Sequence, residues 1–211
     1  MLTLLSNGVS NMECLTEEHI KQRAKVLFFT TGILDASTQE IADFAGVNRT
    51  LVNYYFRSKK NLFNIVYTEI ISEMRAGFAA VYASDGTFRE KVEALIDYTI
   101  EFRETYPFLE IFNIQETSKL NNQMETLLRP TAIKETHLFL KEIEEEMKKG
   151  TIPTYEPVNF LINLMSLISF PIVMKPIFRE IFCISTEEQY QKIYNQRKEM
   201  VMTILFNNVN Q

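Results

Sequence analysis

The chain has 211 residues, of which 46% are hydrophobic and 23% are charged, and its formal net charge is −5. These values fit a globular protein of one or two domains and exclude a disordered or low-complexity chain. Cys14 and Cys183 are too few for a disulfide framework and have no partners at metal-ligand spacing, so we expect two free thiols.

Residues 1–14 lack the basic start and the long apolar stretch of a signal peptide, and we expect a flexible N-terminal tail there. The most apolar run, residues 160–174, contains Asn163, Ser166, Ser169 and Pro171. It is also shorter than the roughly 20 residues that a membrane crossing requires. We therefore predict a buried helix at this run and a cytoplasmic protein.

Apolar residues recur at helical spacing almost throughout, without sustained strand alternation, which predicts an all-α fold of about nine helices. The first helix is expected from near Thr16 to near Gly32. Thr38 is predicted to cap a short helix that Gly46 ends, because glycine accepts the positive φ of a tight turn. A second short helix follows up to residue 55 or 56, and Ser58 is expected to cap a longer one.

Further helices are expected at residues 88–105, 107–119, 130–148, 156–182 and 186–208. The last two are apolar on more than one side, and a helix that is apolar nearly all round must be covered nearly all round. A homodimer in which these helices pair would cover them, since two-fold interfaces are the commonest kind; burial within one chain is the alternative. The predicted interface residues are Leu161, Met165, Ile168, Tyr194, Val201 and Leu205.

Charge is unevenly distributed along the chain. Residues 15–63 hold seven Lys/Arg and five Asp/Glu, whereas residues 64–211 hold fifteen and twenty-one. No acid occurs between Asp43 and Glu69, although four basic residues fall in that gap. A basic segment without acids inside an acidic protein indicates a partner with negative charge.

The same segment predicts a pair of helices that fits a DNA groove. Ile41, Ala45, Val47 and Val52 would form an apolar seam, with Gly46 at the corner, so that the second helix could enter a major groove. Arginine pairs with guanine, asparagine with adenine, and threonine contacts the thymine methyl. The outer side of the second helix would present Arg49, Thr50, Asn53 and Tyr54, with Tyr55 near its end.

Phosphate contacts are predicted at two helix starts. Thr38 and Ser58 each place a hydroxyl beside free backbone N–H groups, which together can hold a phosphate. Lys59 and Lys60 add positive charge beside the second start.

A spaced motif runs through this segment: Ile41-Ala42, Ala45-Gly46-Val47-Asn48, Val52-Asn53, Phe56, Ser58-Lys59 and Leu62. With this motif, the chain from about Glu17 to Tyr67 resembles the DNA-binding domain of the TetR/AcrR family of bacterial transcriptional regulators. The resemblance implies a helix-turn-helix domain over residues 15–63, continuing into the fourth helix. It also implies a helical effector-binding and dimerisation domain over residues 64–211.

The resemblance further implies the contacts of single residues. Base contacts fall on Arg49, Thr50 and Leu51, and phosphate contacts on Thr38, Gln39 and Lys59. The tyrosine that commonly grips the DNA backbone in the family is Asn53 here, so Tyr54 or Tyr55 takes over that contact or Asn53 contacts a base. Arg57 replaces the family's Pro or Gly and could add a backbone contact. The predicted DNA-binding set is Thr38, Gln39, Arg49, Thr50, Leu51, Asn53, Tyr54, Tyr55, Arg57, Ser58, Lys59 and Lys60.

A member of this family would be a homodimeric repressor that a small molecule releases from a palindromic operator. Aromatic residues of the C-terminal part could line an apolar pocket for a hydrophobic or amphipathic effector, although such residues more often form core. The predicted pocket residues are Tyr98, Phe102, Tyr106, Phe112, His137, Phe170 and Met174.

Two other classes of function compete with this one. An architectural DNA-binding or protein-interaction module without a small-molecule switch remains the alternative. An enzyme is not expected, because the sequence shows no nucleophile with a base, no metal-ligand set and no glycine-rich phosphate loop. We accordingly predict no catalytic residue, metal or cofactor.

Overall fold

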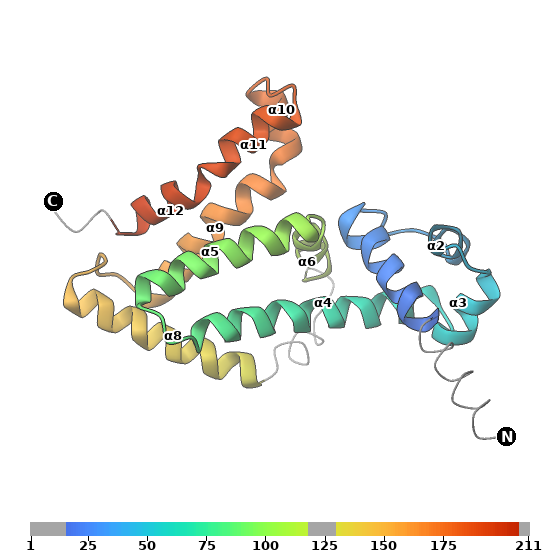
Figure 1. Ribbon diagram of the computed structural model, residues 1–211, viewed down its shortest axis with the longest axis horizontal. Helices are drawn as coiled ribbons and strands as arrows, with labels where there is room; N and C mark the ends of the chain where they lie inside the picture. The colour runs from blue at the N-terminus through green and yellow to red at the C-terminus, as the bar shows by residue number, and fades with distance from the viewer. Residues whose placement is uncertain (1–15, 118–129, 207–211) are drawn as a thin grey trace. The chain divides into compact units, whose positions relative to one another are not determined.

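The computed structural model describes residues 16–117 and 130–206, and all regular structure within these ranges is helical (Figure 1). The chain divides into two compact units. The N-terminal unit runs to Ser72 and also includes Tyr106–Leu109, and the C-terminal unit comprises Glu73–Thr105 and the chain from Glu110 onward. The predicted tail, residues 1–14, lies outside the described residues.

The N-terminal unit is a small helical domain. Residues 16–25 are α-helical and continue into a π-helical turn, η1 (Val26–Thr30). They are followed by α2 (Thr38–Ala45), α3 (Arg49–Phe56) and the first half of α4 (Lys59–Tyr82). Large apolar side chains from every one of these helices are fully buried: Ile20, Phe28, Phe29, Ile41, Phe56, Leu62 and Ile70.

The N-terminus of α2 differs by one residue from the prediction. Ser37, and not Thr38, is the N-cap: its hydroxyl accepts a hydrogen bond from the backbone N–H of Glu40, while Glu40 accepts one from the backbone of Ser37. This reciprocal pair is a capping box, which satisfies two backbone donors at once. Thr38 is therefore the first residue inside the helix.

The C-terminal unit is built from the remaining helices. They are α5 (Phe88–Thr105), α6 (Leu109–Thr117), α8 (Pro130–Lys149), α9 (Pro157–Val173), α10 (Lys175–Ile181), α11 (Glu187–Asn195) and α12 (Arg197–Phe206). One face of α5, α8, α9 and α12 forms a common core that includes Leu95, Phe139, Phe160, Leu164 and Val201. Within this unit, α9 packs against α5, α8 and α12.

Each of the two long C-terminal helices predicted from the sequence is broken. The first divides into α9 and α10 at Met174, with a bend of 67°. Pro176 explains this break, because it lacks the N–H that would continue α9 but fits the first turn of a new helix. The second divides into α11 and α12 at Gln196. Thr186 caps α11 with a capping box to Gln189.

No single described helix is long and apolar enough to cross a membrane. By length and composition alone, α9 and α10 pass that test as a bent pair.

A glycine sets the spacing between α4 and α5 inside the C-terminal unit. A Cβ on Gly77 would lie 2.0 Å from Cζ of Tyr98, so only glycine fits beneath this ring. The Tyr98 hydroxyl donates to the carbonyl oxygens of Glu73 and Met74 at 3.1 and 3.2 Å. Tyr98 therefore fastens α5 to α4.

Candidate nucleic-acid interface

The helix pair α2–α3 is locked by a buried seam. Ile41, Ala42, Val52 and Phe56 are each at most 1% exposed, so the two helices are joined by buried apolar side chains. Gly46 between them has φ of 67°, a left-handed conformation that glycine adopts without steric cost, and its N–H bonds to the end of α2. The opposite side of α3 is thereby turned outward.

Every predicted DNA-binding residue is exposed or half-exposed. Thr38, Tyr55 and Lys59 are half-exposed, while Gln39, Arg49, Thr50, Leu51, Asn53, Tyr54, Arg57, Ser58 and Lys60 are exposed. Tyr54 is the most exposed of the large apolar side chains on α3, at 61% exposure. The face from Arg49 to Tyr55 is thus available to an outside partner.

The start of α3 is fixed by its own cap. Asn48 is the N-cap, and its Oδ1 accepts a hydrogen bond from the N–H of Thr50 at 2.8 Å. Arg49 follows as the first helical residue, and it makes no ion pair with any described residue. Its guanidinium is free to meet a base edge or a phosphate.

The turn between α3 and α4 has an unusual backbone. Arg57 has φ of 63°, which is rare for a residue with a side chain. The Ser58 hydroxyl accepts from the N–H of Asn61 and so caps α4. Lys59 donates from Nζ to the carbonyl oxygen of Asp35 at 3.0 Å, while Lys60 extends into solvent. Lys59 therefore ties the turn to the loop before α2, and Lys60 offers an uncommitted charge.

Two side chains of the first helix, His19 and Arg23, donate hydrogen bonds to backbone carbonyls of α2. His19 donates from Nε2 to the carbonyl oxygen of Ala45 at 2.8 Å. Arg23 donates twice to the carbonyl oxygen of Phe44, at 2.8 and 3.0 Å, and its guanidinium lies over the Phe44 ring. These donors satisfy carbonyls at the C-terminus of α2, where a positive charge also complements the helix dipole.

The first helix is joined to α4 by an ion-pair network. Lys21 and Lys25 contact Glu69 at 2.7 and 2.9 Å. Burial raises the pKa of Glu69, but the hydrogen bonds and charges of the two lysines outweigh it, so the pKa lies below its ordinary value of 4.5. Sequence reasoning did not single out this network, because the spacing of Lys21 and Glu69 gives no local signal.

The predicted effector-pocket residues do not gather around one described cavity. Phe102 and Phe112 are buried, whereas His137 is exposed and Phe170 is 56% exposed. Tyr106 belongs to the N-terminal unit, and Met174 stands at the break between α9 and α10. Tyr98 packs on Gly77, as described above.

The part of the chain that the structure describes also contains no cluster of His, Cys, Asp or Glu that could hold a metal.

Most of the predicted dimer-interface residues are buried within the chain's own C-terminal unit. Ile168, Tyr194, Val201 and Leu205 are 0–6% exposed and pack inside the chain's own C-terminal unit. Leu161 and Met165 are half-buried and also pack against that core. Large exposed apolar side chains instead occupy other positions of these helices: Val158, Ile162, Phe170, Ile193, Met200 and Ile204. Helical periodicity showed that both faces are apolar but not which one turns inward.

The geometry of α2 and α3 defines a helix-turn-helix DNA-binding domain. Residues 20–66 match the family described as bacterial regulatory proteins, tetR family. A similar protein is the probable HTH-type transcriptional regulator YttP of Bacillus subtilis strain 168, which is 25% identical over 185 residues, or 85% of this chain and 87% of YttP.

Solved structures share the whole fold. The hemolysin II transcriptional regulator HlyIIR matches with a TM-score of 0.61 and 20% identity, covering 92% of this chain and 98% of HlyIIR. A TetR/AcrR-family regulator of Thermobifida fusca YX-ER1 matches with a TM-score of 0.57 and 18% identity, covering 88% and 96%. The N-terminal unit therefore has the helix-turn-helix domain of the tetR family of bacterial regulatory proteins, and the fold of the chain is that of solved TetR/AcrR-family regulators. These similarities indicate a DNA-binding transcriptional regulator.

Proposed function

We propose that this regulator is a homodimeric repressor, and that a small hydrophobic or amphipathic effector releases it from a palindromic operator. The observation that supports DNA recognition most directly is the outward face of α3, where Arg49, Thr50 and Asn53 are all exposed. These residue types match the major-groove edges of guanine, thymine and adenine.

Phosphate contacts would position this face. The N-terminus of α2 presents Thr38 and Gln39 in its first turn, and the Ser58 turn presents Arg57 and Lys60. Backbone N–H groups at helix starts and nearby cations are the usual phosphate donors, and they fix register without reading sequence.

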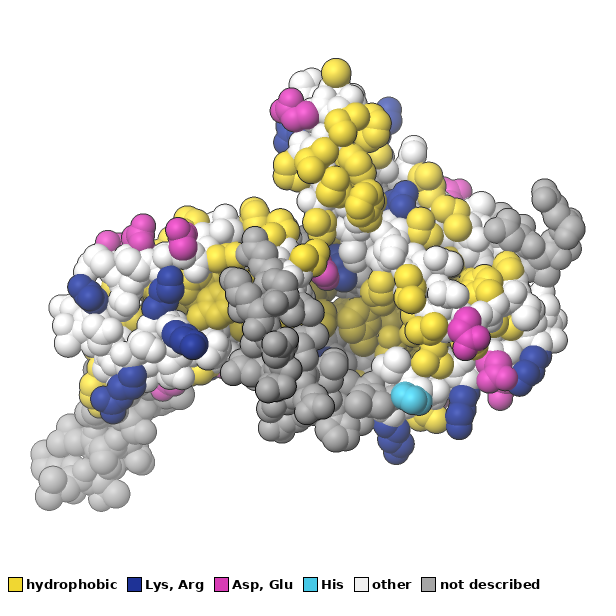
Figure 2. All heavy atoms as spheres, turned by 180° about the vertical axis from the view of Figure 1, so that it is seen from behind, with side chains coloured by type: hydrophobic (Ala, Val, Ile, Leu, Met, Phe, Trp, Pro, Cys, Tyr) yellow, Lys and Arg dark blue, Asp and Glu magenta, His cyan; other side chains and the backbone are white. Residues whose placement is uncertain are grey.

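The homodimer would form through the exposed apolar face of α9, α11 and α12. Ile162, Ile193, Met200 and Ile204 are 45–55% exposed, although such side chains are normally buried. Figure 2 shows hydrophobic side chains gathered on the projection formed by α10 and the adjoining ends of α9 and α11. A two-fold pairing of these surfaces would present two α3 helices to one operator.

Repression and release would follow from a shift in population. An effector that binds one conformation of the dimer better favours a spacing of the α3 helices that no longer fits consecutive major grooves, which lie about 34 Å apart. Regulators of the TetR family are typically dimeric and have small-molecule effectors, which supports such a switch here.

Gel-shift titration with the chain's own upstream region tests the proposal. Binding is expected to weaken steeply with salt, and Lys60→Ala should lower the log–log salt slope by about 0.9 for each phosphate that is no longer neutralised. Lys141→Ala, an exposed lysine on α8, serves as the matched control and should leave the slope unchanged. Absence of binding to any cognate genomic fragment at low salt would contradict DNA recognition by this chain.

A further inference from the structure

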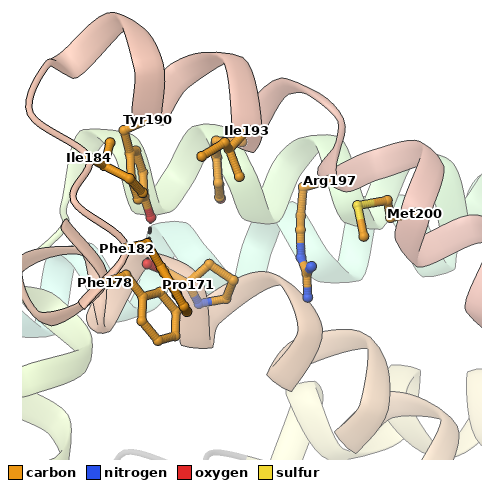
Figure 3. Close-up of a pocket in the computed structure, with 9 residues that line it drawn as sticks. Pro171, Phe178, Phe182, Ile184, Tyr190, Ile193, Arg197 and Met200 are labelled. Atoms are coloured by element: carbon orange, nitrogen blue, oxygen red, sulfur yellow. Dashed lines mark hydrogen bonds between the residues drawn. The ribbon is translucent and has the colours of Figure 1, made fainter. Parts of the chain in front are cut away.

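A cavity of about 310 Å³ lies within the C-terminal unit between α9–α10 and α11–α12 (Figure 3). Its walls are almost entirely apolar, with Pro171 and Phe178 on one side and Tyr190 and Ile193 on the other. The Tyr190 hydroxyl is already used, because it donates to the carbonyl oxygen of Pro171. The volume falls at the lower end of the range of small-molecule sites.

One charged side chain, Arg197, is among the described residues that line this cavity. Its position follows from Pro171. Proline has no N–H, so the carbonyl of Leu167, four residues earlier in α9, loses its helical hydrogen bond. Arg197 replaces that bond: its Nε donates to the Leu167 oxygen at 2.6 Å. This anchors the stem of the side chain and leaves both Nη groups uncommitted.

Three nearby cations have carboxylate partners, and Arg197 does not. Lys175 and Arg179 pair with Glu187, and Lys198 pairs with Asp97. Arg197 has no carboxylate within ion-pair distance among the described residues, although it is only partly exposed. A partly buried guanidinium without a counter-ion is unfavourable, and a planar carboxylate is the group that its fork matches best.

We propose that this cavity is the effector site and that it takes an amphiphile with a short aliphatic body and a carboxylate head, which pairs with Arg197. The role as effector site rests on the proposed function above. Ile193 and Met200 line the cavity and also belong to the exposed apolar face, so an occupant would alter the surface that a second copy covers. Occupancy is thereby linked to the geometry of the dimer.

Calorimetric titration of the full chain with octanoate and with octan-1-ol tests the site. Arg197→Gln removes the charge but keeps an amide donor for the Leu167 carbonyl, so its melting temperature should stay close to that of the wild type. Octanoate affinity should fall about tenfold or more in Arg197→Gln, while octanol affinity should not change. Lys192→Gln, an exposed position of α11 that does not line the cavity, is the matched control.

Met200→Trp should weaken both ligands, because the larger side chain fills part of the cavity. Octanoate should also weaken DNA binding of the wild type and do so less in Arg197→Gln. Absence of saturable octanoate binding, or equal octanoate affinity in wild type and Arg197→Gln, would overturn the site. Octanoate binding that leaves DNA affinity unchanged would overturn its role as the effector site. A chain that never binds DNA would refute the proposed function alone, since the calorimetric result is obtained without DNA.

Discussion

The two compact units differ in the kind of side chain that they leave exposed. In the N-terminal unit the apolar faces of the helices meet one another, and the outer side of α3 exposes the polar side chains of Arg49, Thr50 and Asn53. The C-terminal unit also has a buried core, yet α9, α11 and α12 keep large apolar side chains in solvent, among them Ile162, Ile193 and Ile204. The first unit therefore needs a polar, charged partner and the second an apolar one, which is the division expected of a dimeric DNA-binding regulator.

The largest expected effect lies in the C-terminal unit. Gly77→Ala places a methyl group inside the Tyr98 ring and should lower the free energy of unfolding by about 1–3 kcal/mol, measured by urea denaturation. Gly86→Ala is the control, because its new methyl group would meet only ordinary contacts. Equal stability of Gly77→Ala and wild type would show that Tyr98 does not fasten α5 to α4.

A comparable effect on binding is expected from Arg49→Ala in the N-terminal unit. Loss of the guanidinium should reduce operator affinity by about 1–3 kcal/mol per half-site and relax base preference, with no change in melting temperature. Fluorescence anisotropy with operator and scrambled duplexes measures both quantities. If Arg49→Ala only lowered stability, the assignment of Arg49 to the DNA face would be wrong.

A smaller effect is expected from the network that joins the first helix to α4. The folded pKa of Glu69 is lowered, so the stability that it contributes is fully present above its ordinary value of 4.5 and is lost as the pH falls through the lowered value. Glu69→Gln should cost roughly 1 kcal/mol or less at neutral pH and should flatten the loss of stability in acid. Denaturation curves of both chains, recorded between pH 7 and acid, measure this difference. If the wild type and Glu69→Gln lost stability with falling pH in the same way, the ion-pair network would not be formed.

The smallest expected effect is at Arg57, where one substitution should raise stability and weaken DNA binding. Arg57→Gly removes the strain of a positive φ and should stabilise the N-terminal unit by about 1 kcal/mol or less. It should also weaken DNA binding slightly, because a cation beside the Ser58 turn is removed. Thermal melts and gel shifts of the same preparation separate the two quantities, and a less stable Arg57→Gly chain would contradict the strained turn.

The sequence predicted the N-terminal unit closely because its signals are local. Gly46 requires its turn, Asn48 and Ser58 cap their helices, and each helix has one apolar face. The cap of α2 was predicted at Thr38 and lies at Ser37, because two adjacent hydroxyl residues offer the same chemistry.

The C-terminal unit was predicted less well because its decisive signals are not local. Pro176 did carry a signal for the break at Met174, but Gln196 carries none for the break between α11 and α12. Ile168 and Val201 lie on stripes as apolar as the exposed ones, so periodicity could not assign the buried face. Arg197 reaches the cavity only because Pro171, on another helix, frees the Leu167 carbonyl.

Selection from a random duplex library by the purified full chain tests the central claim most directly. The face of α3, presented twice by a two-fold dimer, predicts enrichment of an inverted repeat, and Arg49→Ala should lose preference at one symmetric pair of positions. Enrichment of no sequence, or of the same repeat with unchanged preference by Arg49→Ala, would contradict the account.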